Sequence, residues 1–472
     1  MTYDGIRKVA IFTFAAFLFI FTTDFIDHVR ASDPLSAYYS SDNDRIFWFI
    51  LISDAQIGAY NGNGSENLEW IVTEAKDVIE PEFIVNEGDL TDSTNWDSDL
   101  WPDGPWQDEW EEYLSILETN EVDSSFYYDI PGNHDHYNDE YFDYYLSYSI
   151  QGRATGQTQI SWTRTFDFGT YHFLGINTAG NDGAGFNLWP IDNFGDHAGL
   201  DETELQFIEE ELKQNKDVDL TLIFGHHPIE KRSSEWTDTA LSEGADEFVE
   251  LMNQYGVLMY GYGHTHTYRE EVFTQGMTEG VLYLNTKSIY SSDESQYTLI
   301  AIDCNGLSVV PVDLRTWPVV LITAPLDTGL GGGNPFVYPV PKFHSNPIRA
   351  LVFDESPITS VQYRIDETSD WYPMTRVETN PHLWEGQWDA TLLSDEGYTI
   401  EVQATGSSTR SDSITIGFNT DTSSSASDSS EEDENCFITI AAHGSSVARE
   451  VTDLKAFKDD FFSLLFRNIL AF

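Results

Sequence analysis

Five short clusters of polar residues occur along the first two thirds of the chain, each directly after an apolar run. In chain order they are Asp54-Ala55-Gln56, Gly88-Asp89-Leu90-Thr91-Asp92, Gly132-Asn133-His134-Asp135, His226-His227-Pro228 and Gly263-His264-Thr265-His266. They supply carboxylate oxygens, amide oxygens and imidazole nitrogens, a mixture that suits Fe, Mn or Zn better than Ca. One such cluster alone is more often a helix cap or a turn, but the ordered set predicts a metal site.

The apolar runs before these clusters are interpreted as β-strands that bring the clusters to a common edge. The runs cover residues 46–52, 83–85, 126–130, 220–224 and 257–260, and helical patterns lie between them at 66–79, 202–213 and 243–255. This alternation is typical of a layered α/β domain. Alternating patterns near 162–176 and 280–312 predict antiparallel strands beside the central ones. Because ligands of open α/β sheets bind at the carboxyl ends of strands, we expect the clusters to converge there.

With these five clusters in this order, residues 45–314 resemble the calcineurin-like metallophosphoesterase superfamily, which includes purple acid phosphatases, many phosphodiesterases and protein phosphatases. The resemblance implies a four-layered α/β/β/α sandwich with a dinuclear metal centre. Two cations roughly 3.5 to 4 Å apart neutralise a phosphate ester and stabilise its attacking and leaving oxygens. The implied activity is hydrolysis of a phosphomonoester or phosphodiester by a metal-bound hydroxide, without a covalent enzyme intermediate.

The resemblance also implies roles for individual residues. Asp89 is expected to bridge the two metal ions. The remaining ligands would be Asp54, Gln56 and His266 in the first metal site and Asn133, His226 and His264 in the second. His134 is the candidate general acid, and Asp92 would fix its ring by accepting the other N–H. The implied cofactors are two divalent or trivalent ions of Fe, Mn or Zn.

Gln56 departs from the family pattern, which usually has histidine two residues after the first aspartate. Because an amide oxygen is a weaker ligand than imidazole, the first site is expected to bind its ion loosely or to favour a harder ion such as Mn or Mg. In an alternative interpretation, Gln56 bonds only to the backbone and the centre holds one metal. His136 and His227 are candidate substrate-binding residues, and the alternatives are a solvated His136 and a packed His227.

The rest of the chain is expected to form separate units. Residues 317–418 carry short alternating runs separated by Gly, Pro, Asp and Ser, which predict an all-β, Ig-like sandwich. Residues 419–435 form an acidic, Ser-rich linker. Residues 436–472 begin with Cys436-Phe437-Ile438, continue into a helical pattern, and partly resemble a C-terminal box of exported bacterial proteins. At the other end, Arg7 and Lys8 precede an apolar run, so residues 1–31 are expected to be a signal peptide or an N-terminal anchor.

Composition excludes some classes of function. The 472 residues contain 23 Lys and Arg against 80 Asp and Glu, a net charge of -57. Such a charge repels phosphate backbones, so binding to a nucleic-acid duplex is not expected. Repulsion among the excess negative charges also destabilises a compact chain at low ionic strength. We therefore expect the protein to work in surroundings rich in cations. The two cysteines allow at most one disulfide, so hydrophobic cores must hold the fold.

These features predict an exported, metal-dependent phosphoesterase that is periplasmic, displayed on the cell surface or secreted. Its partner would be a phosphate-ester substrate, and its N- or C-terminal segment would anchor it to a membrane or cell surface. The rival hypothesis is a non-catalytic surface binding protein that keeps the fold with a partly occupied metal centre. The two hypotheses differ in metal content, since a catalyst of this type binds about two ions per chain and the binding protein at most one.

Overall fold

The computed structural model describes residues 45–417, except for 95–103, 181–185, 189–190, 195–197, 231–239, 274–279, 293, 335–336, 338–339, 341, 343–344, 367–369, 392 and 395–396. The predicted signal or anchor at 1–31, the linker at 419–435 and the segment at 436–472 lie outside the described residues. Within the described part of the chain, no helix has the length and apolar character needed to cross a membrane.

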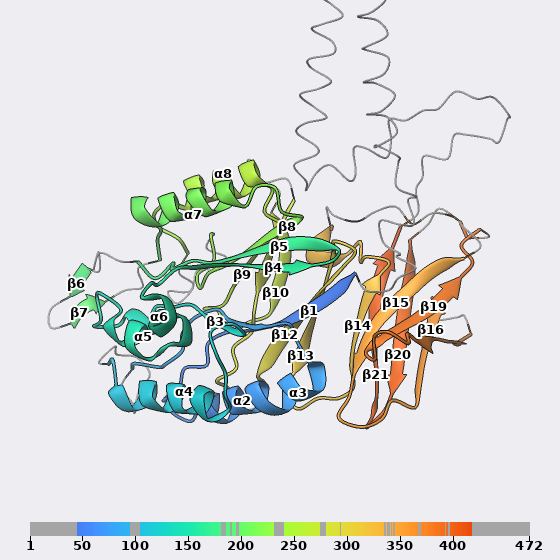
Figure 1. The fold of residues 1–472 in the computed structure, drawn as a ribbon, viewed down its shortest axis with the longest axis horizontal. Helices are drawn as coiled ribbons and strands as arrows, with labels where there is room; N and C mark the ends of the chain where they lie inside the picture. The colour runs from blue at the N-terminus through green and yellow to red at the C-terminus, as the bar shows by residue number, and fades with distance from the viewer. Residues whose placement is uncertain are drawn as a thin grey trace, which may run out of the picture.

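Two stacked sheets form the centre of the first domain (Figure 1). The five-stranded sheet has the order β13-β12-β1-β2-β3 and contains β1 (Ile46–Ile52), β2 (Ile84–Asn86), β3 (Tyr127–Asp129), β12 (Gln296–Asp303) and β13 (Gly306–Asp313). The six-stranded sheet has the order β10-β11-β9-β8-β5-β4 and contains β4 (Ile160–Phe166), β5 (Gly169–Gly175), β8 (Leu220–Phe224), β9 (Met259–Tyr262), β10 (Arg269–Phe273) and β11 (Val281–Asn285). The strands that lead into the polar clusters run parallel to one another: β1 pairs with β2, β2 with β3, and β8 with β9. The flanking strands β4, β10, β12 and β13 run antiparallel.

Helices cover the outer face of each sheet (Figure 1). Those on the five-stranded sheet are α2 (Gly64–Trp70), the π-helical stretch η2 (Ile71–Ala75), α3 (Lys76–Ile79), α4 (Gln107–Thr119), α5 (Asp143–Tyr148) and α6 (Ile150–Thr155). The six-stranded sheet is covered by α7 (Glu202–Gln214) and α8 (Ala245–Tyr255). Strands β6 (Phe186–Leu188) and β7 (Ile191–Phe194) pair with each other in a separate hairpin. The predicted four-layered α/β/β/α sandwich is therefore confirmed.

Local sequence signals account for the start of α7 and the end of α8, the two helices that cover the six-stranded sheet. The carboxylate of Asp201 accepts hydrogen bonds from the N–H groups of Thr203 and Glu204, and Glu204 accepts one from the N–H of Asp201. This capping box satisfies donors that the first turn of α7 would otherwise leave unpaired. Helix α8 ends at Gly256, whose φ of 65° is the left-handed conformation that glycine adopts at little cost.

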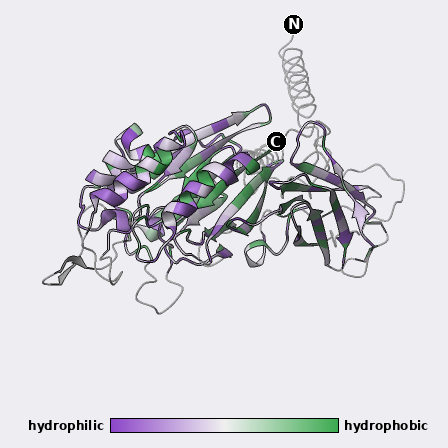
Figure 2. Ribbon diagram, turned by 90° about the horizontal axis from the view of Figure 1, so that it is seen from below, coloured by the Kyte–Doolittle hydropathy of each residue, from purple (hydrophilic) through white to green (hydrophobic). Residues whose placement is uncertain are grey.

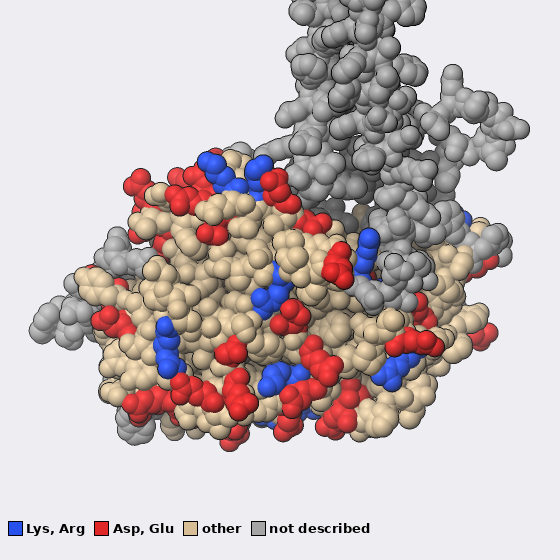
Figure 3. All heavy atoms as spheres, viewed as in Figure 1, with Lys and Arg blue, Asp and Glu red and all other residues tan. Residues whose placement is uncertain are grey.

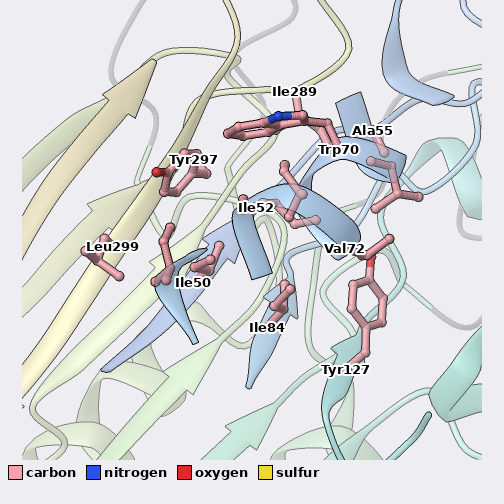
Figure 4. Close-up of a cluster of buried hydrophobic side chains, with 14 of the residues drawn as sticks. Ile50, Ile52, Ala55, Trp70, Val72, Ile84, Tyr127, Ile289, Tyr297 and Leu299 are labelled. Carbon is pink, nitrogen blue, oxygen red and sulfur yellow. The ribbon is translucent and has the colours of Figure 1, made fainter. Parts of the chain in front are cut away.

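Strand β1 shows how the layers are held together. Its side chains alternate, so Phe47 and Phe49 enter the core between the two sheets, whereas Ile50 and Ile52 enter the core under the helices. Figure 4 shows Ile50 and Ile52 in the second of these cores, together with Trp70 from α2. Full burial of one such side chain stabilises the fold by about 1.5–3 kcal/mol relative to exposure. A single strand therefore joins three of the four layers.

The second domain consists of two four-stranded antiparallel sheets packed face to face. One contains β14 (Val319–Ala324), β15 (Asn346–Phe353), β18 (Thr375–Arg376) and β19 (Leu383–Trp388), and the other contains β16 (Ser360–Ile365), β17 (Tyr372–Pro373), β20 (Tyr398–Thr405) and β21 (Thr409–Ile416). Both sheets contribute to one buried core, which includes Ile348, Val352, Val361 and Val402. The short 3₁₀ turn η4 (Leu330–Gly332) lies in the connection between β14 and β15. The predicted Ig-like all-β architecture is confirmed.

The two domains share a buried junction. The core under the helices of the first domain continues into the second through Trp317, Leu351 and Phe353. Beside this core, the buried guanidinium of Arg349 on β15 donates a hydrogen bond from Nε to Oδ2 of Asp303 on β12, at 2.9 Å. The junction is therefore built like the interior of a domain, with apolar packing and a paired internal charge.

Charged side chains are scattered over the face of the molecule that Figure 3 shows, among uncharged ones. The helices in Figure 2 carry both hydrophilic and hydrophobic residues, as helices with one buried face do. On the face shown in Figure 3, acidic side chains are spread over the described surface with basic ones scattered among them. This distribution agrees with the excess of Asp and Glu over Lys and Arg in the sequence.

Candidate metal centre

The five polar clusters converge at the carboxyl ends of β1, β2, β3, β8 and β9. Hydrogen bonds from main-chain N–H groups tie their loops together. The N–H of Asp54 donates to the carbonyl of Gly88 at 3.0 Å between two loops of the five-stranded sheet, and the N–H of His264 after β9 donates to Oδ2 of Asp54 after β1 at 3.1 Å. The site therefore lies where loops of both sheets meet.

Three predicted ligands of the second metal meet around one amide oxygen. Oδ1 of Asn133 lies 3.0 Å from Nε2 of His226 and 3.1 Å from Nδ1 of His264. Oδ2 of Asp89 lies 3.2 Å from the same Nε2 of His226. The other ring nitrogen of His226 lies 2.8 Å from the carbonyl oxygen of Glu87, to which it donates. This outer hydrogen bond directs Nε2 of His226 toward the centre, as in metal-binding histidines.

Asp54 connects the predicted ligands of the first metal to those of the second. Its Oδ1 lies 3.2 Å from Nε2 of His266. Carboxylate oxygens of Asp54 and Asp89 and a ring nitrogen of His226 all lie within 4.8 Å of one another. Gln56 turns its amide nitrogen toward Nε2 of His134, at 3.3 Å. The structure thus brings all seven predicted ligand residues to one place, with Gln56 directed at the neighbouring histidine ring.

The chemistry of these groups fits a cation. Burial favours the neutral form of the fully buried Asp54, yet His266 beside its Oδ1 holds the pKa of this carboxyl below the usual range. Burial favours the neutral form of Asp89, yet His226 and His134 hold the pKa of its carboxyl well below the usual range. In turn, burial disfavours the charged form of His226, yet Asp89 raises the pKa of this imidazole to about 10. Buried carboxylates that require positive charge, beside amide oxygen and imidazole nitrogen, are a donor set for divalent ions.

Most of the predicted ligands lie on left-handed backbone. The φ angles are 52° at Asp54, 40° at Gln56, 53° at Asp89, 67° at His264 and 57° at His266. Residues other than glycine rarely adopt this conformation, which costs on the order of 1 kcal/mol or more at each position. Backbone strain of this kind clusters at functional sites, where the surrounding structure enforces it.

Two glycines allow the loops to approach one another closely. A Cβ atom at Gly132 would lie 2.2 Å from Oδ1 of Asp89, and one at Gly263 would lie 1.7 Å from Oγ of Ser53. Any larger residue at either position would displace the centre. Only glycine therefore fits at these two positions, because a side chain would collide with the neighbouring loop.

His134 lies beside the centre with both ring nitrogens engaged. Its Nε2 lies 3.8 Å from Oδ2 of Asp89. Its Nδ1 is hydrogen-bonded to the main-chain carbonyl oxygen of Asp92, whereas the Asp92 carboxylate lies 3.6 Å away and accepts a hydrogen bond from Oγ1 of Thr94. Asp92 thus orients the ring through its main chain rather than through the carboxylate that we expected. Burial disfavours the charged ring, yet the carboxylates of Asp89 and Asp92 raise the pKa of His134.

The two predicted substrate contacts are both enclosed by protein. His136 is 6% exposed and packs on Phe142, with ring centroids 4.8 Å apart. His227 is fully buried, with Nδ1 3.0 Å from Oγ1 of Thr178 and its ring 4.6 Å from that of His264. A ring nitrogen of His227 also belongs to a cluster of possible ligand atoms with His264. Both rings are buried, as the predicted metal ligands Asp89 and His226 are, and a role in binding substrate stays a prediction.

Sequence patterns did not point to several residues that support the centre. Oγ1 of Thr178 accepts hydrogen bonds from the N–H groups of His226 and His227, at 3.0 and 3.1 Å. Asn285 donates from Nδ2 to the carbonyl of the last residue of β9, at 3.0 Å, and to that of Gly263 directly after it, at 2.6 Å. Burial raises the pKa of the fully buried Glu87 well above its usual range. Of these three residues, only Glu87 could have been found from the sequence, because it lies in the same motif as Asp89. Thr178 and Asn285 lie far from the five clusters in the sequence.

Comparison with known proteins agrees with this geometry. Residues 47–268 match the calcineurin-like phosphoesterase family, and residues 314–422 match the TMEM62 Ig-like domain. Transmembrane protein 62 of Mus musculus is 28% identical over 339 residues, covering 69% of this chain and 48% of the mouse protein. A protein of Arabidopsis thaliana provisionally named a metallophosphoesterase is 22% identical over 378 residues, covering 69% of this chain and 49% of that protein. The chain thus spans about half the length of these curated relatives.

A solved structure also shows similarity. GAP50, the anchor in the inner membrane complex of Plasmodium, is similar over 58% of this chain and 86% of its own, with 15% identity and a TM-score of 0.36. The polar clusters at the strand ends, the layered architecture and the two family matches agree with one another. Residues 47–268 therefore form a calcineurin-like phosphoesterase domain, and residues 314–422 form an Ig-like domain of the TMEM62 type.

Proposed function

We propose that the chain is an exported, metal-dependent phosphoesterase that hydrolyses a phosphomonoester or a phosphodiester. The observation that carries the proposal is the meeting of ligand atoms from Asp54, Asp89 and His226 within 4.8 Å, beside the ring of His134. The proposed ligands are Asp54, Gln56, Asp89 and His266 for one ion, and Asp89, Asn133, His226 and His264 for the other. The proposed ions are Fe, Mn or Zn.

The chain's own residues hold and move the proton that the reaction needs. When bound, the ions would neutralise the phosphate ester and polarise water for attack. Nδ1 of His134 is held by the carbonyl of Asp92, so Nε2 faces the centre. As the bond between phosphorus and the leaving oxygen breaks, Nε2 of His134 gives a proton to that oxygen, and the ring regains a proton from solvent. Water supplies the oxygen that joins phosphorus, so the reaction requires no covalent enzyme intermediate.

Gln56 is the ligand at which this chain differs from the usual family pattern. Its amide nitrogen faces Nε2 of His134 at 3.3 Å, so its amide oxygen is the atom left for an ion. Because an amide oxygen is harder and weaker than imidazole, we propose that this site favours Mn over Zn.

Export and association with a membrane or cell surface belong to the same proposal. Arg7 and Lys8 before the apolar run at 9–21 support a targeting segment. The name of the mouse relative, Transmembrane protein 62, supports a membrane-associated location. The net charge of -57 fits surroundings in which cations screen the surface.

Hydrolysis by the purified full-length chain tests this function. We would assay an aryl phosphomonoester and an aryl phosphodiester in high salt with Mn, Zn or Fe, and measure bound metal in parallel. We expect about two ions per chain and turnover of at least one ester. Asp89→Asn should lose both metal and turnover, whereas His134→Ala should keep the metal and lose about 10²- to 10⁴-fold in turnover. Asp77→Asn, at an exposed position on α3, is the matched control.

Two outcomes of these assays would contradict the proposed function. If neither ester is turned over with any of these metals and the chain binds one ion or none, the non-catalytic surface binding protein becomes the better hypothesis. If two ions bind without turnover of either ester, the centre is a metal site but ester hydrolysis is rejected.

A further inference from the structure

We propose that Glu109 is a positioning residue for His134 and acts through the peptide group between Asp92 and Ser93. The carbonyl oxygen of this peptide group is hydrogen-bonded to Nδ1 of His134. The N–H of the same peptide group, on Ser93, donates to Oε2 of Glu109 at 3.0 Å. Glu109 and His134 therefore lie at opposite ends of one peptide dipole. The general-acid role of His134 rests on the proposed function, but this geometry does not depend on it.

Hydrogen bonds linked through one peptide group strengthen one another. An acceptor at the N–H end polarises the amide, which makes the carbonyl oxygen a better acceptor at the other end. The bond from Glu109 thus favours a proton on Nδ1 of His134 and holds the ring in place. Nε2 of that ring is then directed toward Oδ2 of Asp89, 3.8 Å away. The tautomer of a histidine is set by the bond that its other nitrogen makes.

Three segments fix the position of Glu109. It lies in the first turn of α4, directly before the fully buried Trp110, so the helix holds its backbone firmly. Its carboxylate packs against Gly58, where a Cβ atom would lie 2.2 Å from Oε1 of Glu109. Ser93, which donates to it, has left-handed backbone with a φ of 51°. The loops after β1 and β2 are therefore both shaped to accept this side chain.

The carboxylate of Asp92 does not take over this role. It accepts a hydrogen bond from Oγ1 of Thr94 and lies 3.6 Å from Nδ1 of His134. Because the acceptor that His134 uses is a main-chain oxygen, no substitution removes it directly. A substitution of Glu109 instead changes how strongly that oxygen accepts the hydrogen bond from His134. Burial also raises the pKa of Glu109 to about 8, so a neutral glutamine is a close substitute for it.

The tautomer of His134 provides a test that does not require activity. We would label the histidines of the metal-free, full-length chain with ¹⁵N, assign the His134 signals with His134→Ala, and record the ring at a pH where it is neutral. The wild-type ring should carry its proton on Nδ1. Glu109→Ala should give a mixture of both tautomers, whereas Glu109→Gln, which keeps an acceptor, should resemble the wild type. Glu112→Ala, exposed on the same helix, is the matched control.

The leaving-group dependence of turnover provides the second test. A general acid matters most for a poor leaving group, so Glu109→Ala should slow a phenyl ester about tenfold more than a 4-nitrophenyl ester. In the His134→Ala background this difference should disappear, because Glu109 would have no ring to position. If Glu109→Ala fails to fold, Glu109→Asp replaces it, since the shorter side chain falls short of the Ser93 N–H.

The inference is overturned if the tautomer of His134 is unchanged in Glu109→Ala. It is also overturned if both esters slow equally, since that result indicates a merely structural role. If the wild type hydrolyses no ester, the proposed function fails while the tautomer still decides the role of Glu109. The two failures are therefore distinguishable.

Discussion

At the scale of single residues, Tyr137 orients Asn133, a predicted ligand whose amide could otherwise face the centre with its nitrogen. Asn133 donates from Nδ2 to the hydroxyl of Tyr137 at 2.9 Å, which turns its Oδ1 toward His226 and His264. An amide with its nitrogen toward the centre could not bind a cation, because the N–H groups are donors only. The ring of Tyr137 also lies 4.8 Å from that of His134. One tyrosine therefore supports both a predicted ligand and the candidate general acid.

Removal of this hydroxyl should weaken metal binding. Tyr137→Phe is expected to raise the Kd for Mn about 10- to 100-fold, because the amide loses the outer partner that orients it. Calorimetric titration of the metal-free chain with Mn measures this change. Tyr141→Phe, whose side chain is 69% exposed in the same region, is the control. An unchanged Kd in Tyr137→Phe would show that packing alone orients Asn133.

At the scale of elements, β5 and its neighbours enclose a histidine whose hydrogen-bond partners among the described residues are uncharged. His172 on β5 is fully buried. Its Nε2 lies 3.0 Å from Oγ of Ser161 on β4 and 3.4 Å from Nδ2 of Asn215 at the end of α7. Its Nδ1 lies 3.4 Å from Oγ1 of Thr221 on β8. Because all three partners are uncharged, burial lowers the pKa of His172 to about 4.

This histidine should make stability depend on pH. The unfolded chain takes up the proton with a pKa of 6.5 and the folded chain only with a pKa of about 4. The unfolded state thus binds more protons in this window, so the free energy of unfolding falls as pH falls through it. Between about pH 7 and about pH 4.5 the wild type should lose about 2 kcal/mol more than His172→Gln. Urea unfolding of the metal-free chains at both pH values measures the difference, and equal losses would contradict the prediction.

At the scale of the whole molecule, one buried ion pair joins the two domains. Arg349 and Asp303 are both buried and lie on strands of different domains. Thr323 donates to the same carboxylate oxygen of Asp303 at 2.7 Å. Since apolar residues of both domains share one core around this pair, we expect the domains to unfold in one cooperative transition.

Loss of the arginine would leave an unpaired charge inside this junction. Arg349→Ala is therefore expected to lower the free energy of unfolding by about 3–5 kcal/mol. Arg153→Ala is the matched control, since Arg153 pairs with Glu118 at 2.7 Å on the surface of the first domain, where the two side chains are 42% and 55% exposed. The control should cost no more than about 1 kcal/mol. Chemical denaturation measures both variants, and similar losses would refute the importance of the buried pair.

The elements show which features a sequence pattern can predict. Strands β1 and β8 have the bounds expected from their apolar runs, because polar residues or glycine follow each run directly. Strand β9 runs over Met259–Tyr262 rather than 257–260, since pairing with its neighbours sets its ends. Strand β14 (Val319–Ala324) was not predicted: alternation marked the strands expected in the second domain, whereas β14 is a continuous, mostly apolar run like β1 and is buried throughout.

The sequence by itself determined the chemical types of the candidate ligands, the strand ends that carry them and hence the layered fold. These features depend on local apolar runs and on the chemistry of single side chains. Only the tertiary structure decided that a main-chain carbonyl holds His134, that Glu109 lies behind that peptide group and that Tyr137 orients Asn133. Every residue carries the same main-chain carbonyl, and every residue except proline the same N–H, so no sequence pattern marks which of these groups a folded loop will leave for a distant side chain.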